Sequence, residues 1–392
     1  MCASLAAVIA VAVVSGCSAN DDPAIETGAA QQVSDLPKAE GRRAVPISDD
    51  IVVVGGGATP NGDGSYSPVY EMWTIGDNRQ PIQLPALPAD GIVEGLSGVQ
   101  VGETLVLGGQ DCTFGGGEML LCGARVPTMW TKSEGDSEWE AHPFPEDFLD
   151  GVAWSGDTVT GGGELQVFGS VNDRAVLALS GGGRIRFGTF DPGSDEFSVL
   201  GDGLASSLSL SATPFCVDAD GAVLHARSHS LDPAGDQLEA EEVSLARLQP
   251  DGRWEEGPRA RLGDLSAHRS VGTMDLACLQ ERDPLVSIYV TGADPVIASV
   301  DQESLGLSPL ADVVAGLKGG ENQIVSTLPD IVGAQPNGDV LIRSNDQVFA
   351  LGADGSVAQA GDVDAEASDG GAVLVGDGLL VVDNDTGAVD VE

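Results

Sequence analysis

Histidine pairs are the first candidates for chemistry in this chain of 392 residues, which has only four histidines. His225 and His229 are four residues apart, a spacing that on an α-helix would place both rings on one face and let them share a metal ion. The residues around them instead form a strand pattern that leads into serines. On a strand this spacing separates the two residues by about 13 Å, too far for one ion. The sequence therefore predicts no metal site here, and we expect no cofactor.

Two further segments have residue types that could do chemistry. His268-Arg269-Ser270 precedes a predicted strand and is interpreted as a turn, because a Ser-His-Asp hydrolase site would come with a Gly-x-Ser-x-Gly elbow that the chain lacks. The segment Asp383-Asn384-Asp385-Thr386-Gly387 offers oxygen ligands for Ca²⁺, but it lacks the remaining carboxylates of a calcium loop. A β-turn is the favoured interpretation. The sequence assigns no catalytic residue.

Four cysteines in the body of the chain predict two disulfides, since an even number in an exported protein favours pairing. Cys112 and Cys122 lie ten residues apart in one glycine-rich loop and are expected to pair with each other. Cys216 and Cys278 then form the second pair by elimination. Zinc binding is disfavoured because no Cys-x-x-Cys pattern surrounds them.

The N-terminal residues predict export and lipidation. Leu5 to Val14 form an apolar run too short to span a bilayer, and Val14-Ser15-Gly16-Cys17 follows it. This pattern resembles a bacterial lipobox, which implies cleavage before Cys17 and a lipid on the new N-terminus. Residues 1–16 are then the signal peptide and residues 17–44 a flexible polar tether that holds the folded part off the cell membrane. A secretion signal with an incidental cysteine is the alternative.

The charge of the chain limits its partners. The 61 acidic residues against 18 Lys and Arg give a formal net charge of −43, and the acids are scattered instead of forming one block. Such a field repels nucleic acid and anionic lipid headgroups. We interpret it as a heavily solvated surface, with an acidic docking surface for a cationic partner as the alternative.

Short valine-rich strands with paired glycines recur along the rest of the chain and predict an all-β fold. Ile51 to Gly56 returns as Thr104 to Gly109, offset by 53 residues at the glycines, and Met72-Trp73-Thr74 returns as Met129-Trp130-Thr131, offset by 57. The four extra residues fall between the second and third strands, in the loop of Cys112. Paired glycines allow the close backbone approach that inner strands need.

Lead strands are predicted to start near positions 51, 104, 165, 222, 285, 340 and 379, a spacing typical of propeller blades. The order of apolar strand, Gly-Gly, aromatic third strand, polar turn, Trp and Leu-Pro exit resembles the kelch repeat of kelch and galactose-oxidase-type β-propellers. The final unit resembles a pyrroloquinoline-quinone-enzyme type of repeat. The resemblance implies a single β-propeller over residues 45–392 with seven four-stranded blades, or six. The last sheet is short of a strand, and Arg42 to Ile47 or the segment before it is expected to complete the ring.

The resemblance also raises two enzyme types that the residues disfavour. A copper-radical oxidase needs two tyrosines, two histidines and a cysteine fused to a tyrosine, whereas these cysteines are predicted to form disulfides. A sialidase-like propeller needs an arginine cluster and Ser-x-Asp-x-Gly-x-x-Trp turns, which Ser133 to Trp139 only approximates. Trp139 and Trp254 are expected to pack between blades.

The sequence therefore favours a non-catalytic binding propeller, anchored by lipid at the bacterial cell surface, whose partner is a protein or carbohydrate. The Cys112–Cys122 loop is the predicted partner surface. Its candidate binding residues are Gln110, Asp111, Thr113, Phe114, Glu118 and Arg125. The alternative is a propeller enzyme, either a carbohydrate-active hydrolase or a quinone-type oxidoreductase. Carboxylates or an arginine cluster at the propeller axis would favour that alternative.

Overall fold

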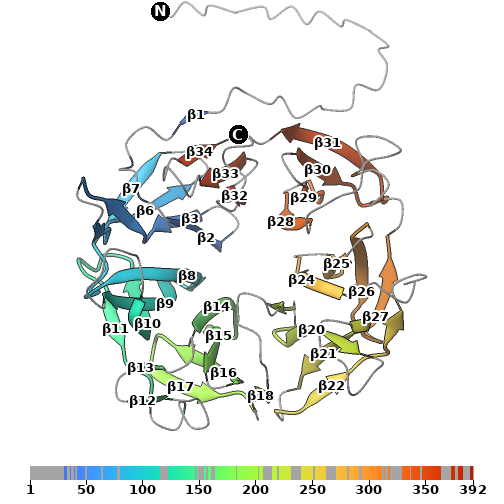
Figure 1. The fold of residues 1–392 in the computed structure, drawn as a ribbon, viewed down its shortest axis with the longest axis horizontal. Helices are drawn as coiled ribbons and strands as arrows, with labels where there is room; N and C mark the ends of the chain where they lie inside the picture. The colour runs from blue at the N-terminus through green and yellow to red at the C-terminus, as the bar shows by residue number, and fades with distance from the viewer. Residues whose placement is uncertain are drawn as a thin grey trace, which may run out of the picture.

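The computed structural model places strands from Gln31 to Val391 in a closed ring of β-sheets (Figure 1). It describes most of this range; residues 1–30, 115–121, 206–213, 231–239, 262–270, 318–328, 363–371 and 383–388, with shorter gaps in turns, lie outside the description. The predicted signal peptide and the lipidation residue Cys17 are therefore outside it. Among the described residues, no helix has the length and apolar character to cross a membrane.

Antiparallel strands build the blades, because the short apolar runs are separated by turn residues that let each strand pair with the next. The strands of the first three blades, from the axis outward, are β2 (Arg43–Ser48), β3 (Ile51–Gly55), β6 (Met72–Gly76) and β7 (Pro81–Leu84); β8 (Ile92–Val101), β9 (Thr104–Phe114), β10 (Cys122–Ser133) and β11 (Glu140–His142); and β14 (Glu164–Val171), β15 (Arg174–Gly181), β16 (Arg184–Asp191) and β17 (Glu196–Val199).

The next three blades continue the ring in the same order. Their strands are β19 (Phe215–Val217), β20 (Val223–Ser230), β21 (Ala240–Leu248) and β22 (Trp254–Glu256); β24 (Val271–Ala277), β25 (Leu285–Val290), β26 (Val296–Asp301) and β27 (Gly306–Pro309); and β28 (Asp330–Ala334), β29 (Val340–Ser344), β30 (Gln347–Leu351) and β31 (Val357–Asp362). Short accessory strands are β4 (Ala58–Pro60), β5 (Tyr66–Pro68), β12 (Trp154–Ser155), β13 (Thr158–Val159), β18 (Leu204–Ala205) and β23 (Ala260–Arg261).

The ring closes through a strand from the other end of the chain. The final sheet takes β32 (Ala372–Val375), β33 (Gly378–Val382) and β34 (Val389–Val391) from the C-terminus, and β1 (Gln31–Gln32) pairs with β34 as its fourth strand. Within the described residues, six four-stranded sheets are therefore continuous in the chain and this seventh sheet is composite. The all-β propeller of four-stranded blades is confirmed. Of the two expected closing segments, the one before Arg42 supplies the strand.

One predicted strand was given the wrong place in its blade. Leu165 to Gly169 was expected to be the lead strand of the third unit, but it lies in β14, the innermost strand, and β15 occupies the second position. The turn between them is made by Asn172 and Asp173, both at positive φ (47° and 59°). Glycine usually marks such a two-residue hairpin turn, so the sequence pattern did not reveal this one.

The paired glycines meet close neighbours, as predicted. A Cβ atom added to Gly55 would lie 2.1 Å from the Met72 sulfur, and one added to Gly108 would lie 2.8 Å from Val167 of the next blade. The core consists of apolar layers between neighbouring blades, such as Phe187, Phe215 and Trp254 between the third and fourth blades. Trp139 is also buried, and its Nε1 donates a hydrogen bond to the Pro85 carbonyl of the first blade at 2.8 Å. Both predicted tryptophans pack between blades.

The two faces of the ring differ in their connections. One face has the turns between first and second and between third and fourth strands, and several of these share one five-residue hydrogen-bond pattern: Asp218–Ala222, Gln249–Arg253, Gln335–Asp339 and Gly352–Ser356. In each, glycine at the fourth position donates its N–H to the first carbonyl and has a φ near +80°. We call this the short-turn face. The opposite face has the longer connections.

Candidate functional site

Two aspartates come together from the innermost strands of neighbouring blades. Asp275 lies on β24 of the fifth blade and Asp330 begins β28 of the sixth, and both strands lie on the inner side of the ring (Figure 1). Leu276 packs toward the fourth blade, so the alternation along β24 directs Asp275 toward the sixth. This arrangement places two carboxyl groups between the innermost strands of neighbouring blades.

Backbone hydrogen bonds fix the Asp275 side chain. Its Oδ1 accepts from the N–H of Leu276 at 2.9 Å, and its Oδ2 accepts from the N–H of Ile331 at 3.3 Å, on the next blade. Ser97 makes a comparable link, because its Oγ accepts from the N–H of Val167 at 2.9 Å. Asp275 therefore also joins two inner strands. What distinguishes it from Ser97 is a second acid beside it.

Burial and mutual repulsion make Asp275 a weaker acid. Burial first, and then the charge of Asp330, raise the pKa of Asp275 to about 6, and its two backbone hydrogen bonds oppose that increase. Burial also raises the pKa of Asp330, although 44% of this side chain reaches solvent. The pair therefore contains a carboxyl group that holds its proton to about pH 6 next to an acid that a solute can reach.

Arg343 is the cation at this site. Its Nε lies 3.9 Å from Oδ2 of Asp330, the residue opposite it in the β28–β29 pairing, and this charge opposes the rise in the pKa of Asp330. Arg343 thus favours the ionised form of Asp330 over that of Asp275. Two neighbouring carboxyl groups, of which one has a cation beside it, can divide the roles of acid and base in hydrolysis.

A metal-dependent site is not visible in the described part of the chain, where no group of three His, Cys, Asp or Glu side chains is arranged to hold an ion. His225 and His229 both lie on β20, so their predicted strand is confirmed. Burial lowers the pKa of His225 to about 3, and its Nδ1 donates to the Pro214 carbonyl at 3.2 Å. His229 Nε2 instead contacts Ser244 Oγ at 2.7 Å and Glu256 at 3.1 Å. Each ring therefore has separate protein partners.

Ser244 and His229 do not form a nucleophilic pair. Ser244 is fully buried and donates its hydroxyl hydrogen to Glu256 at 3.1 Å, so it accepts from the histidine. The segments 268–270 and 383–387, considered above as a hydrolase turn and a calcium loop, lie outside the described residues.

The predicted binding loop is described only at its base. Asp111 accepts hydrogen bonds from the N–H groups of Asp90 (2.8 Å) and Gly91 (2.7 Å), so it holds the segment that leads into β8. Gln110 is buried, and its side-chain amide donates to the Glu94 carbonyl at 2.9 Å and accepts from the N–H of Leu165 at 2.7 Å. The other candidates, Thr113, Phe114, Glu118 and Arg125, have side chains outside the described residues. Within the described part, the loop base is devoted to internal contacts.

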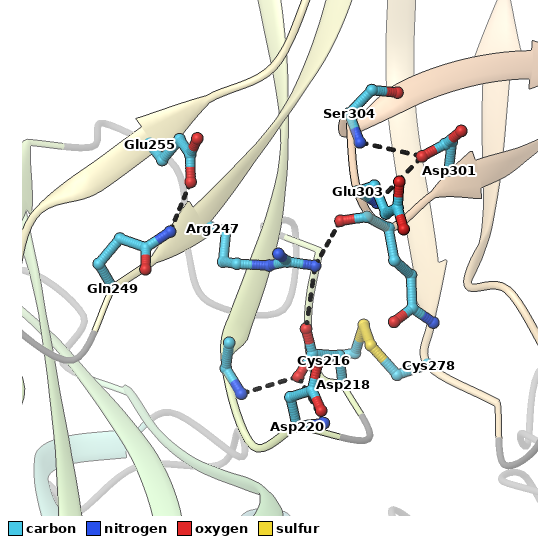
Figure 2. A network of polar contacts seen from close by, with 12 residues as sticks. Cys216, Asp218, Asp220, Arg247, Gln249, Glu255, Cys278, Asp301, Glu303 and Ser304 are labelled. Carbon is cyan, nitrogen blue, oxygen red and sulfur yellow. Dashed lines mark hydrogen bonds and ion pairs between the residues drawn. A yellow bond between two sulfur atoms is a disulfide. The ribbon is translucent and has the colours of Figure 1, made fainter.

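The predicted disulfide between Cys216 and Cys278 is confirmed and joins the fourth and fifth blades at the short-turn face (Figure 2). Beside it, Arg247 forms an ion pair with fully buried Asp218 at 3.4 Å and donates to the Gln302 carbonyl of the fifth blade at 2.7 Å. Cys112 is also disulfide-bonded. Its pairing with Cys122 stays a prediction, because the Cys122 side chain lies outside the described residues.

The aspartate pair has little signal in the sequence. Asp275 and Asp330 are 55 residues apart and belong to no local motif. Asp275 follows Thr273 and Met274 in a strand, where an acid between apolar residues could have been noticed as an unusual inner-strand position. Only the ring topology brings the two together.

Comparisons with known proteins identify no family. No protein-family model and no curated protein matches the chain. Among solved structures, it is similar to the periplasmic gluconolactonase of Pseudomonas aeruginosa, with 13% identity, 86% of each chain covered and a TM-score of 0.48. A putative 6-phosphogluconolactonase of Bacteroides fragilis gives 13% identity over 85% of this chain and 87% of that one, with a TM-score of 0.47. A protein from Lactobacillus plantarum gives 11% identity over 91% and 90%, with a TM-score of 0.46.

Proposed function

We propose that this chain is a propeller hydrolase whose acid–base pair is Asp275 and Asp330. The observation that supports it is the convergence of two carboxyl groups with raised pKa values on adjacent inner strands, with Arg343 beside one of them. Perturbed acids that share a site are typical of catalytic centres. The proposal therefore rests on the combination of the two carboxyl groups, the neighbouring cation and their position between inner strands.

In the proposed reaction, ionised Asp330 takes a proton from a water molecule as that water attacks the carbon of a C–O bond. Asp275 in its acid form donates its proton to the departing oxygen. The products are a hydroxyl on the attacked carbon and a free alcohol, and the proton count is restored when the two carboxyl groups exchange protons with water. Arg343 keeps Asp330 ionised while its neighbour remains protonated.

The substrate proposed is a neutral carbohydrate, as a glycoside or an ester. The formal net charge of −43 disfavours the approach of anions, so a phosphorylated or carboxylated sugar would be repelled. We further propose that the enzyme acts outside the cytoplasm, held to the cell membrane by a lipid on Cys17. The kelch-type origin of the repeats and a protein or carbohydrate partner on the Cys112–Cys122 loop also remain proposals.

The test is turnover of a panel of 4-nitrophenyl glycosides and 4-nitrophenyl acetate by the full chain. Asp330→Asn is expected to lower kcat by about 100-fold or more, since general acid–base groups contribute roughly 10²–10⁴ in rate. Glu196→Gln, at an exposed position of β17, is the matched control and should leave kcat unchanged. Absence of turnover over the whole panel, or equal loss in both variants, would count against a hydrolase and favour the binding module.

The pH dependence provides a second test of the assignment. Because Asp275 must be protonated, kcat should fall as pH rises above about 6, approaching tenfold per pH unit. Asp275→Asn should remove both the activity and this alkaline limb. A rate that rises through pH 6 and levels off above it would reverse the two roles.

A further inference from the structure

A groove of about 610 Å³ opens between the first and second blades, near the short-turn face and away from the aspartate pair. Ile51 and Ile82 line it from the first blade, and Leu105 lines it from the second. Gly76 is the register partner of Ile51, and the missing side chain there leaves space beside the isoleucine. The volume falls within the range typical of small-molecule sites, roughly 300–1,000 Å³.

The apolar wall of this groove is exposed to solvent. Ile82 is 61% exposed, and among the described residues it is the one large hydrophobic side chain in the exposed class. It lies on the outer strand β7, opposite Thr74. A single exposed isoleucine needs no explanation, but here it faces a groove together with two other aliphatic side chains. An aliphatic ligand would cover this surface.

A half-buried cation lies beside the apolar wall. Lys132 is the register partner of Leu105 on β10, so the two side chains are neighbours on one face of the sheet. Its Nζ donates to the carbonyl of the adjacent Ser133 at 3.2 Å, and within the described part of the chain no ion pair involves it. In a protein with 61 acidic residues, an ammonium group without a carboxylate partner leaves a place for an anion.

Two carboxylates complete the groove at its rim. Glu103 and Glu134 are exposed and belong to two turns that a hydrogen bond joins, from the N–H of Glu134 to the carbonyl of Glu103 at 3.1 Å. The lining therefore combines one cation, two anions and an aliphatic wall. A simple anion would be attracted by Lys132 and repelled by the rim, whereas a ligand with both charges would satisfy each.

We propose that this groove binds a short apolar peptide through its free termini. The terminal carboxylate pairs with Lys132, the terminal ammonium lies against Glu103 and Glu134, and the aliphatic side chains cover Ile51, Ile82 and Leu105. A groove of this volume holds more than one amino acid, so a dipeptide or tripeptide is the class that fits. This site is independent of the hydrolase proposal, since no residue is shared.

The experiment is isothermal titration calorimetry of the full chain with the dipeptide Leu-Leu, its N-acetyl form and its C-terminal amide. Leu-Leu should bind, and each blocked form should bind at least about tenfold more weakly, because each loses one charge-assisted contact. Lys132→Gln should weaken Leu-Leu by a similar factor and should no longer distinguish the amide from the free acid. Arg184→Gln removes one positive charge from the third blade and should bind as the parent does.

Three results would each overturn the proposal. The first is the absence of a titration signal for Leu-Leu at about 10 mM. The second is an unchanged affinity in Lys132→Gln with a thermal unfolding midpoint equal to that of the parent. The third is equal binding of Leu-Leu and its amide, which would remove the role of Lys132. Glu134→Gln provides the second check, since it should weaken Leu-Leu more than it weakens the N-acetyl form.

Discussion

The surroundings of Asp275 have two opposite effects on its pKa. It accepts two backbone hydrogen bonds, which favour the ionised carboxylate, yet burial and Asp330 raise its pKa to about 6. The protein therefore keeps an acid at a position where a serine, as at Ser97, makes a comparable inter-blade link without a titratable group. Retaining a costly residue at such a place is typical of functional sites.

The raised pKa predicts how stability changes with pH at this residue. The carboxyl is neutral in both folded and unfolded chains below about pH 3, and its contribution is lost as pH rises from about 4 through about 6, because the unfolded chain ionises at the lower pKa. Relative to Asp275→Asn, the parent should lose up to about 3 kcal/mol of unfolding free energy between pH 4 and pH 7. Urea unfolding of both proteins across this range is the measurement.

Asp301 provides the control of opposite sign. Hydrogen bonds from the N–H groups of Ser304 and Glu303 lower its pKa, with Ser304 the larger cause. The stabilisation by ionised Asp301 is present above the unfolded pKa and is lost as pH falls through the folded pKa. The difference in unfolding free energy between the parent and Asp301→Asn should therefore become smaller under acid conditions. If both variants shifted the curve in the same direction, the assignment of Asp275 would be wrong.

Among the secondary-structure elements, the contact between β21 and its neighbours shows how adjacent blades are held. Arg247 spans from buried Asp218 in its own blade to the Gln302 carbonyl of the next, near the Cys216–Cys278 disulfide (Figure 2). Arg282 does the same one blade later, where it donates to the carbonyls of Gly338, Leu351 and Gly352. Arginine suits this position because its planar group can donate several hydrogen bonds at once.

Arg247→Met is expected to destabilise the fold strongly, because it leaves the Asp218 carboxylate buried without its cation. The loss should be about 3 kcal/mol or more of unfolding free energy, as for other broken buried pairs. Arg174→Met is the matched control: its pair with Asp191 is 3.6 Å long with side chains 41% and 27% exposed, so less than about 1 kcal/mol is expected. Equal losses in the two variants by chemical unfolding would contradict this account.

Strand positions within a blade could be predicted where local chemistry marks them and not elsewhere. The glycine pairs located β3 and β9 because close packing requires a missing side chain there. β15 was missed because its turn uses Asn172 and Asp173 instead of glycine. The Cys216–Cys278 pair could be predicted from an even cysteine count, whereas the approach of Asp275 to Asp330 depends on neighbouring blades and has no local signature.

For the whole molecule, the seventh sheet is completed by two residues of β1, paired as Gln31 with Val391 and Gln32 with Asp390. Removal of residues 1–34 should lower the unfolding free energy relative to removal of residues 1–30, which keeps β1. The expected difference is about 1–3 kcal/mol, from the lost ladder hydrogen bonds. Chemical unfolding of the two truncated chains is the measurement. Identical midpoints would mean that the ring does not need this strand for its stability.

The pairing of β1 with β34 also sets an order of events during biosynthesis. β34 is synthesised after all the strands of the six continuous blades, so these blades can form from local hairpins while the composite blade must wait for β34. A chain that stops short of Val389 would keep an open sheet edge at β33, the kind of edge that promotes aggregation. The composite blade can therefore form only in a chain that includes β34.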